Sequence, residues 1–162
     1  MRIGQGVDAH RLVPGRPLRL GGVEIPSERG LEGHSDGDVL LHAVASALLG
    51  ALGDGDLGTH FPSSDPALAG IASRVIVQQV AEKVRRAGLA VGNVDATVVA
   101  QAPRLAPHLE KMRASLADLL GVERSRVNVK ATSTDGLGAI GRGEGIAALA
   151  VALLVPDAPG RA

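Results

Sequence analysis

The sequence contains no cysteine, no tryptophan and no tyrosine, and its one phenylalanine is Phe61. The absence of cysteine excludes disulfide bonds and thiolate metal sites, so histidines and carboxylates remain as the candidate metal ligands. The scarcity of aromatic residues means that the core must be built from Ala, Val, Leu and Ile. Because small side chains bury little area each, we expect part of the stability to come from association between subunits.

An excess of charge of either sign is also absent, since 17 basic residues balance 17 acidic ones. The basic residues are scattered, so no nucleic-acid-binding surface is predicted. The longest apolar run, Ile146 to Val155, is far below the ~20 residues that a membrane-spanning helix needs. No signal-peptide pattern stands at the start of the sequence. We therefore predict a soluble, cytoplasmic protein without nucleic-acid or membrane partners.

The 162 residues predict one domain over 1–156, followed by a disordered tail over 157–162. The pattern contains no internal repeat and no linker. Hydrophobic periodicity, with glycine and proline as breakers, predicts the elements along the chain. These are a strand over 2–10, two short strands within 18–25, helices over 39–49, 71–87 and 105–120, strands over 89–102 and 127–131, and a buried strand over 146–155.

The segment Gly33–His42 holds two histidines and two aspartates at the start of an apolar helix pattern. Ser35 or Asp36 is expected to cap that helix, because a short side-chain oxygen satisfies a free amide at its start. His42 follows Val39 by three residues, which places it on the stripe that faces the core. A histidine at such a position is more often a hydrogen-bonded core residue than a metal ligand.

Asp8 and His10 change that balance. Side chains two residues apart on a strand project to the same face, so these two can converge on one point. Alone, the pair is more simply explained as exposed residues at a strand end. Together with His42 it supplies two imidazoles and one carboxylate, the ligand count of a catalytic zinc site with an open fourth position.

Three polar loops could serve a ligand or could be ordinary connections. The first follows the predicted helix from Gly53 to Pro66, where Asp54 is most simply a turn residue. The second, Gln101–Pro107, holds two prolines that fix the backbone and leave its polar groups free to contact a ligand. The third, Thr132–Gly138, places hydroxyls and a carboxylate at a strand end, which suits phosphate and metal contacts.

Six motifs occur in order along nearly the whole chain, up to about Val155. They are Gly6–His10, His34–Asp38, Asp54–Gly58, Asn93–Asp95, Ala100–Pro103 and Gly141–Gly145. Together they closely resemble the 2-C-methyl-D-erythritol 2,4-cyclodiphosphate synthase family, with a specificity that no single motif has.

The resemblance implies an α/β (α+β) fold, a compact mixed β-sheet with helices on one face, and a homotrimer with active sites at subunit interfaces. It implies that 4-diphosphocytidyl-2-C-methyl-D-erythritol 2-phosphate is converted to 2-C-methyl-D-erythritol 2,4-cyclodiphosphate and CMP, in non-mevalonate isoprenoid biosynthesis. The implied cofactors are one Zn²⁺ per subunit and Mg²⁺ or Mn²⁺ bound with the substrate diphosphate.

The resemblance also implies roles for individual residues. Asp8, His10 and His42 would hold zinc, His34 and Ser133 would stabilise the transition state, and Asp135 would serve the magnesium or manganese ion. The implied cytidine pocket is Ala100–Ala106. Substrate contacts are implied for Asp8, His10, His34, Ser35, Asp56, Leu57, Gly58, Phe61, Ser63, Ser64, Asp65, Ala100, Gln101, Ala102, Pro103, Arg104, Leu105, Ala106, Thr132, Ser133, Thr134, Asp135 and Arg142.

Three positions depart from the family pattern. Ser133 and Asp135 stand where threonine and glutamate are common, and Ala139 stands where many members have an aromatic residue near a central trimer cavity. The serine keeps the hydroxyl, the shorter aspartate is expected to reach a metal through water, and Ala139 leaves isoprenoid binding beside Arg142 open. Two other functions remain: a zinc-dependent nucleotide diphosphate hydrolase, and a non-catalytic trimer that binds nucleotides or isoprenoids.

Overall fold

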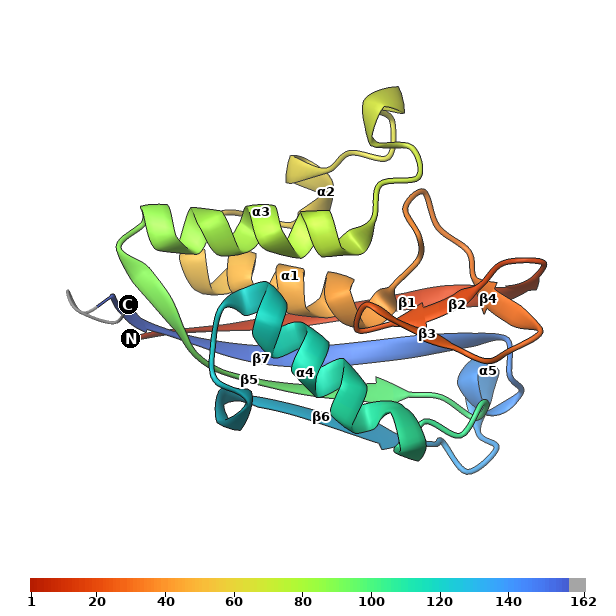
Figure 1. Cartoon of the computed structure of the whole chain (residues 1–162). Helices are drawn as coiled ribbons and strands as arrows, with labels where there is room; N and C mark the ends of the chain where they lie inside the picture. Colours follow the sequence, from red (N-terminus) through yellow and green to blue (C-terminus); the bar gives the residue numbers. More distant parts are fainter. Residues whose placement is uncertain (158–162) are drawn as a thin grey trace.

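A computed structural model describes residues 1–157 as a mixed sheet with helices on one face (Figure 1). The five strands lie in the order β4-β1-β7-β5-β6, and only β5 and β6 run parallel. Their bounds are β1 Arg2–Pro14, β4 Arg29–Leu31, β5 Leu89–Val99, β6 Val127–Thr132 and β7 Gly145–Pro156. The predicted mixed sheet with one-sided helices is confirmed.

Three helices, α1, α3 and α4, cover the sheet, and two short strands form a hairpin beside them (Figure 1). The helices span Val39–Leu52, Ser73–Arg86 and Leu109–Leu120, and the hairpin strands β2 and β3 span Leu18–Leu20 and Val23–Ile25. Two one-turn helices, α2 at Leu57–His60 and α5 at Gly138–Gly141, lie in loops, as do 3-10 turns at Pro66–Leu68, Ala106–His108 and Arg124–Arg126. None of the helices in residues 1–157 is long and apolar enough to cross a membrane.

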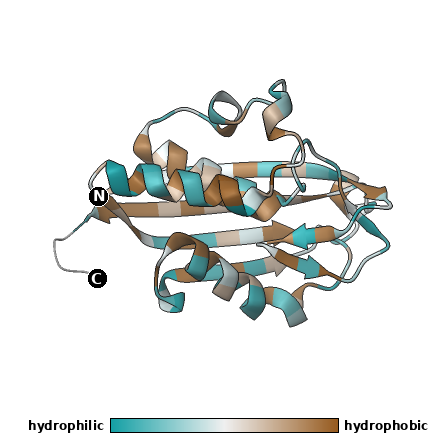
Figure 2. Ribbon diagram, turned by 45° about the horizontal axis from the view of Figure 1, so that its top comes forward, coloured by the Kyte–Doolittle hydropathy of each residue, from teal (hydrophilic) through white to brown (hydrophobic). Residues whose placement is uncertain are grey.

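The expectation of a buried strand over 146–155 is wrong for one face of β7. Its residues alternate between buried and more exposed, because the helices cover only one side of the sheet. Leu149 and Val151 are 40% and 46% exposed on the uncovered side, where Ile3 and Val7 of the neighbouring β1 are 73% and 58% exposed. Hydrophobic residues run along the long strands in Figure 2. The uncovered face thus carries exposed apolar residues on β1 and β7 in the single chain, whereas its β5 and β6 part carries the polar cluster of Asp95, Asn128 and Lys130.

The helix α1 lies against β1 at two glycines. A Cβ atom on Gly4 would stand 2.0 Å from the Ala47 carbonyl oxygen, and one on Gly6 would stand 2.0 Å from the Ala43 carbonyl oxygen. No side chain fits between this strand and this helix. Close contact between the two backbones therefore requires glycine at both strand positions.

The helix cap is Asp38, not Ser35 or Asp36 as expected. The Leu41 N–H donates to Asp38 Oδ1 at 3.1 Å, and the same buried carboxylate accepts the N–H groups of Gly21 and Gly22 at 2.9 and 2.7 Å. Burial raises the pKa of Asp38, although these amides act in the opposite direction. One carboxylate thus starts α1 and fastens the β2–β3 hairpin to it. Gly53, in the left-handed conformation, ends the helix as expected.

Several element ends differ from those predicted. Strand β1 continues beyond His10 because its later residues pair with β4. The chain leaves the sheet at Val99 rather than at position 102, and a 3-10 turn precedes α4, which begins at Leu109. Asp157 donates its N–H to the Gly88 carbonyl. The rest of the predicted tail, 158–162, lies outside the described residues.

Candidate functional site

Three ligand atoms converge where α1 begins above β1. Asp8 Oδ2 lies 2.9 Å from His10 Nε2 and 2.8 Å from His42 Nδ1, and the two ring nitrogens are 3.2 Å apart. Asp8 and His10 pair with buried β7 residues, so both side chains point to the helix-covered face. The strand supplies two ligands, and the first turn of the helix supplies the third.

The electrostatics of this cluster favour a cation. Burial acts to raise the pKa of Asp8, but hydrogen bonds with His10 and His42 outweigh it, and the pKa lies well below its usual value. The hydrogen bond with Asp8 raises the pKa of His10 above its ordinary value, against the effect of burial. The side chains of Asp8 and His10 are 27% and 20% exposed, whereas that of His42 is 8% exposed. An ionised carboxylate and two imidazoles, open on one side, fit a divalent metal ion with one coordination position left free.

The second nitrogen of His42 faces into the protein. Nε2 lies 2.9 Å from Ser73 Oγ and 3.1 Å from Ser35 Oγ. The Ser35 hydroxyl also accepts the Gly37 N–H at 3.1 Å, so this residue points inward behind the cluster. Ser73 was not singled out from the sequence, because the first residue of an amphipathic helix carries no signal of such a contact.

His34 lies on an exposed loop beside the cluster, and its Nε2 is 3.4 Å from the Asp65 carbonyl oxygen. Arg16 holds this loop, because its guanidinium donates to the carbonyls of Gly33 and Ser35 at 3.0 and 2.9 Å. Arg16 thus fixes the backbone on both sides of His34. Sequence reasoning missed it, because one arginine between two strands looks like any surface residue.

The loop between α1 and α3 extends away from the sheet (Figure 1). Asp56 starts α2, accepting the Thr59 N–H at 2.8 Å, and this bond lowers the pKa of the exposed carboxyl. Asp54 takes part in the fold as well as in the turn, since Lys83 of α3 donates to its carboxylate at 3.2 Å. The other predicted contact residues of this loop are accessible: Leu57 and Phe61 are partly buried, and Gly58, Ser63, Ser64 and Asp65 are exposed or nearly so.

A separate cavity of about 290 Å³ forms where β5 and β6 end. Six residues of the predicted cytidine pocket line it, and Ala102 does not. The lining residues are Ala100, Gln101, Pro103, Arg104, Leu105 and Ala106, joined by Ala131, Thr132 and Ser133. The structure thus brings the proline loop and the hydroxyl-rich strand end to one hollow.

The strand-end loop is held by its own polar side chains. The Ser133 hydroxyl donates to Asp135 Oδ1 at 3.1 Å, the Thr134 hydroxyl donates to the Leu137 carbonyl, and Gln101 Oε1 accepts the Gly136 N–H at 3.3 Å. Arg142 is not among the residues that line this cavity, and its Nε lies 2.6 Å from Glu144 Oε1.

The metal cluster with the His34 loop and the 290 Å³ cavity, here called the two half-sites, do not merge within one chain. Asp8 is paired with Ala148 of β7, and Ala148 with Val98 of β5, so two strand spacings of about 5 Å each separate the metal cluster from the start of the proline loop. None of the residues that line the 290 Å³ cavity belongs to the metal cluster or to the His34 loop. His34 and Ser133, predicted to act together, therefore lie in different half-sites.

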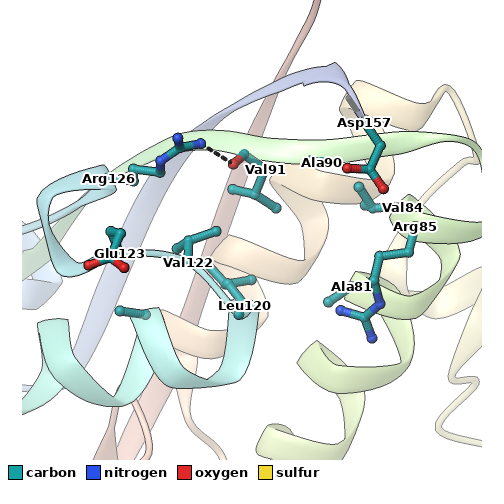
Figure 3. Close-up of a pocket in the computed structure, with 12 residues that line it drawn as sticks. Ala81, Val84, Arg85, Ala90, Val91, Leu120, Val122, Glu123, Arg126 and Asp157 are labelled. Carbon is teal, nitrogen blue, oxygen red and sulfur yellow. Dashed lines mark hydrogen bonds between the residues drawn. The ribbon is translucent and has the colours of Figure 1, made fainter. Parts of the chain in front are cut away.

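A larger cavity of about 690 Å³ lies between the C-terminal ends of α3 and α4 and the start of β5 (Figure 3). Arg126, on its wall, donates to the Val91 carbonyl at 3.5 Å. Its lining includes none of the residues predicted to bind substrate or metal.

Comparison with known proteins places the chain in a family. A model of the YgbB family matches residues 1–155. A 2-C-methyl-D-erythritol 2,4-cyclodiphosphate synthase from Thiobacillus denitrificans is 60% identical over 154 residues, which cover 95% of this chain and 96% of that protein.

Solved structures agree. The bifunctional IspDF from Campylobacter jejuni superposes with a TM-score of 0.91 at 42% identity over 94% of this chain, which spans 42% of that longer chain. A 2C-methyl-D-erythritol-2,4-cyclodiphosphate synthase in its CDP-bound form has a TM-score of 0.88 at 38% identity, covering 95% of this chain and 100% of that one. The chain therefore belongs to the YgbB family, the family of the 2-C-methyl-D-erythritol 2,4-cyclodiphosphate synthases.

Proposed function

We propose that this chain converts 4-diphosphocytidyl-2-C-methyl-D-erythritol 2-phosphate to 2-C-methyl-D-erythritol 2,4-cyclodiphosphate with release of CMP, as a phosphorus–oxygen lyase of non-mevalonate isoprenoid biosynthesis. The carrying observation is the convergence of Asp8, His10 and His42 on one point beside the accessible His34 loop. The similarity to synthases over nearly the whole chain supports the same activity. A cytoplasmic location stays a prediction.

The reaction needs no nucleophile from the protein. An oxygen of the substrate's own 2-phosphate attacks the β-phosphorus of the cytidine diphosphate unit, and the bond from that phosphorus to the bridging oxygen breaks. CMP leaves with the bridging oxygen and the bonding electron pair. Phosphoryl transfer of this kind depends on alignment and on neutralisation of charge.

The residues of the chain can meet these two demands. Zn²⁺ held by Asp8, His10 and His42 would supply a Lewis acid for the β-phosphate oxygens. The His34 ring is accessible, and Arg16 fixes the backbone on both sides of it, so an imidazole N–H can donate to a phosphate oxygen. The Ser133 hydroxyl would donate from the opposite half-site.

We propose that the cytidine base occupies the hollow lined by the Ala100–Ala106 loop. A volume of about 290 Å³ suits one nucleobase with part of its ribose. The CDP-bound relative supports a nucleotide ligand for this fold. Mg²⁺ or Mn²⁺ would accompany the diphosphate with few protein ligands, reached from Asp135 through water.

The homotrimer is part of the proposal. Ile3, Val7, Leu149 and Val151 leave an apolar surface on the uncovered face of β1 and β7, the kind of surface that association buries. The separation of the two half-sites in one chain also favours association, because a second subunit is needed to complete the active site. A neighbouring subunit would bring its nucleotide hollow opposite the metal cluster. Whether a trimer cavity beside Arg142 holds an isoprenoid diphosphate stays a prediction.

One assay tests the reaction and its main alternative. The purified protein is incubated with substrate and Mg²⁺, and the products are identified by ³¹P NMR and by CMP release. A cyclic diphosphate supports the proposal, whereas a linear bisphosphate identifies the zinc-dependent hydrolase. Binding of cytidine nucleotide with no turnover identifies the non-catalytic trimer. The variant His42→Ala, and treatment with a chelator, should each abolish turnover.

A mixing experiment tests the shared site. The inactive variants His42→Ala and Pro103→Asp, each defective in a different half, are dissociated, combined in equal amounts and reassembled. Random mixing in a cyclic trimer gives about a quarter of sites with both halves intact, because each half is intact in half of the subunits. Recovered activity supports the shared site. Verified mixed trimers that show no activity contradict the shared site.

A further inference from the structure

The two nitrogens of His42 meet different surroundings. Nδ1 faces the metal cluster, while Nε2 lies 2.9 Å from the hydroxyl of Ser73, which is fully buried at the start of α3. Ser73 is 31 residues beyond His42 and belongs to none of the motifs that point to the active site. The contact joins two helices behind the metal cluster.

Asp36 sets the direction of the hydrogen bonds that link it to Ser73 and His42. Ser73 Oγ makes a very short contact with Asp36 Oδ1, and Arg19 lies 4.0 Å from the other carboxylate oxygen. A carboxylate beside an arginine only accepts, so the Ser73 hydroxyl proton points to Asp36. The lone pairs of Ser73 Oγ are then free to accept a hydrogen bond from Nε2–H of His42 at 2.9 Å, a shorter contact than the one of 3.1 Å between Nε2 and Ser35 Oγ.

A neutral imidazole carries one ring proton, and a metal needs the other nitrogen bare. Asp8 Oδ2, at 2.8 Å from Nδ1, would equally accept a proton held on Nδ1. The Asp8 carboxylate on one side of the ring and the Ser73 hydroxyl oxygen, oriented by Asp36, on the other therefore compete for one ring proton. The form with Nδ1–H blocks the metal, and the form with Nε2–H admits it.

We propose that Ser73 and Asp36 are positioning residues that hold the His42 proton on Nε2 and so keep Nδ1 ready for the metal. The inference rests on the proposed metal site. Partners behind a ligating histidine typically change metal affinity about 10- to 100-fold when removed.

Asp36 also has a structural part, which the experiment must separate. Its Oδ1 accepts the backbone N–H of Ser73 at 3.2 Å at the start of α3. The variant Ser73→Ala keeps that backbone bond and removes only the hydroxyl. Ser115→Ala is the matched control, because it makes the same change on the neighbouring helix α4, outside the metal cluster.

Zinc affinity is measured by chelator competition with metal-free protein. We expect Ser73→Ala to bind zinc about 10- to 100-fold more weakly than wild type, and Ser115→Ala to bind like wild type. Asp36→Asn, which keeps the shape and loses the charge, should weaken zinc binding in the same direction. Wild-type affinity in folded Ser73→Ala overturns the inference.

The tautomer itself is read from the ¹⁵N imidazole shifts of His42 in metal-free protein. Wild type should show the proton on Nε2, and Ser73→Ala should move population to Nδ1, a change that a merely structural role would not produce. A wild-type ring with its proton on Nδ1 overturns the inference, even if the variants fail to fold. Failure of the metal site is a separate result: wild-type protein would then bind no zinc.

Discussion

The substitution Gly6→Ala should disturb the metal centre, although Gly6 binds nothing. A Cβ at this position would stand 2.0 Å from the Ala43 carbonyl oxygen, which is about 1.4 Å short of the 3.4 Å at which ordinary contact begins. The Ala47 amide nitrogen at 2.7 Å and Ser46 Cβ at 2.9 Å close the other directions. Because the obstacles are mainly backbone atoms, the first turns of α1 must move as a body.

That movement sets the magnitude. His42 directly precedes Ala43, so a shift of about 1 Å at the contact carries Nδ1 with it, far beyond the ~0.2 Å within which metal–ligand distances vary. Overpacking typically costs about 1–3 kcal/mol. At about 2–4 °C per kcal/mol for a domain of this size, the midpoint of thermal unfolding should fall by roughly 2–12 °C. We expect a measurable loss of zinc affinity, well above tenfold.

The control is Gly50→Ala on α1. A Cβ there would meet nothing closer than the Gln5 carbonyl oxygen at 3.5 Å, and alanine in a helix is favoured over glycine by up to about 1 kcal/mol. This variant should keep its zinc and be as stable as wild type or more so. Both proteins are compared at one concentration by chelator competition and thermal unfolding, since association would shift the midpoint. Wild-type zinc affinity and stability in Gly6→Ala would refute the reasoning.

Three further predictions concern the loop, the pH and the base. Replacing Arg16 by Ala should lower turnover by about 10- to 100-fold with zinc content unchanged, because the backbone on both sides of His34 loses the two guanidinium N–H donors. Normal turnover, or loss of zinc, contradicts this prediction. Zinc affinity should fall as the pH decreases, because a proton on His10 competes with the metal. Asp8 raises the pKa of His10 above the ordinary 6.5, and below that pKa the affinity should fall by about tenfold per pH unit. A constant affinity in chelator competition between pH 8 and pH 6 rules this prediction out. The uridine analogue of the substrate should turn over much more slowly, because polar groups of the Ala100–Ala106 hollow would be left unpaired, and equal steady-state rates would show that the hollow does not read the base.

The metal cluster could be predicted because its pieces follow local periodicity. Asp8 and His10 share a strand face by the two-residue repeat, and the apolar pattern correctly placed His42 on a buried helix, although α1 is buried on nearly every side and not along one stripe. What the periodicity does not contain is that the strand and helix lie against each other. The resemblance to a family provided that step.

The residues that sequence reasoning missed act across long separations. Ser73 reaches His42 from another helix, and Arg16 reaches the His34 loop from a turn before β2. The choice of cap failed for a related reason. Asp38 is fixed as the cap because the hairpin glycines also need its carboxylate, and Asp36 is taken by α3. Each of these assignments depends on tertiary neighbours that no local pattern names.

The positions of β1 that face α1 explain why the site stands where it does. Gly4 and Gly6 have no side chain, so the helix rests on the strand there; Asp8 and His10 follow on the same face, where the helix begins and its first turn offers His42. A slip of one residue in the pairing of β1 would turn all four positions to the uncovered face. It would remove the space for the helix and two of the three ligands at once. The alternation of side chains along β1 therefore determines both the packing of α1 and the position of the candidate metal ligands. Once α1 packs against β1, Asp8, His10 and His42 already lie together.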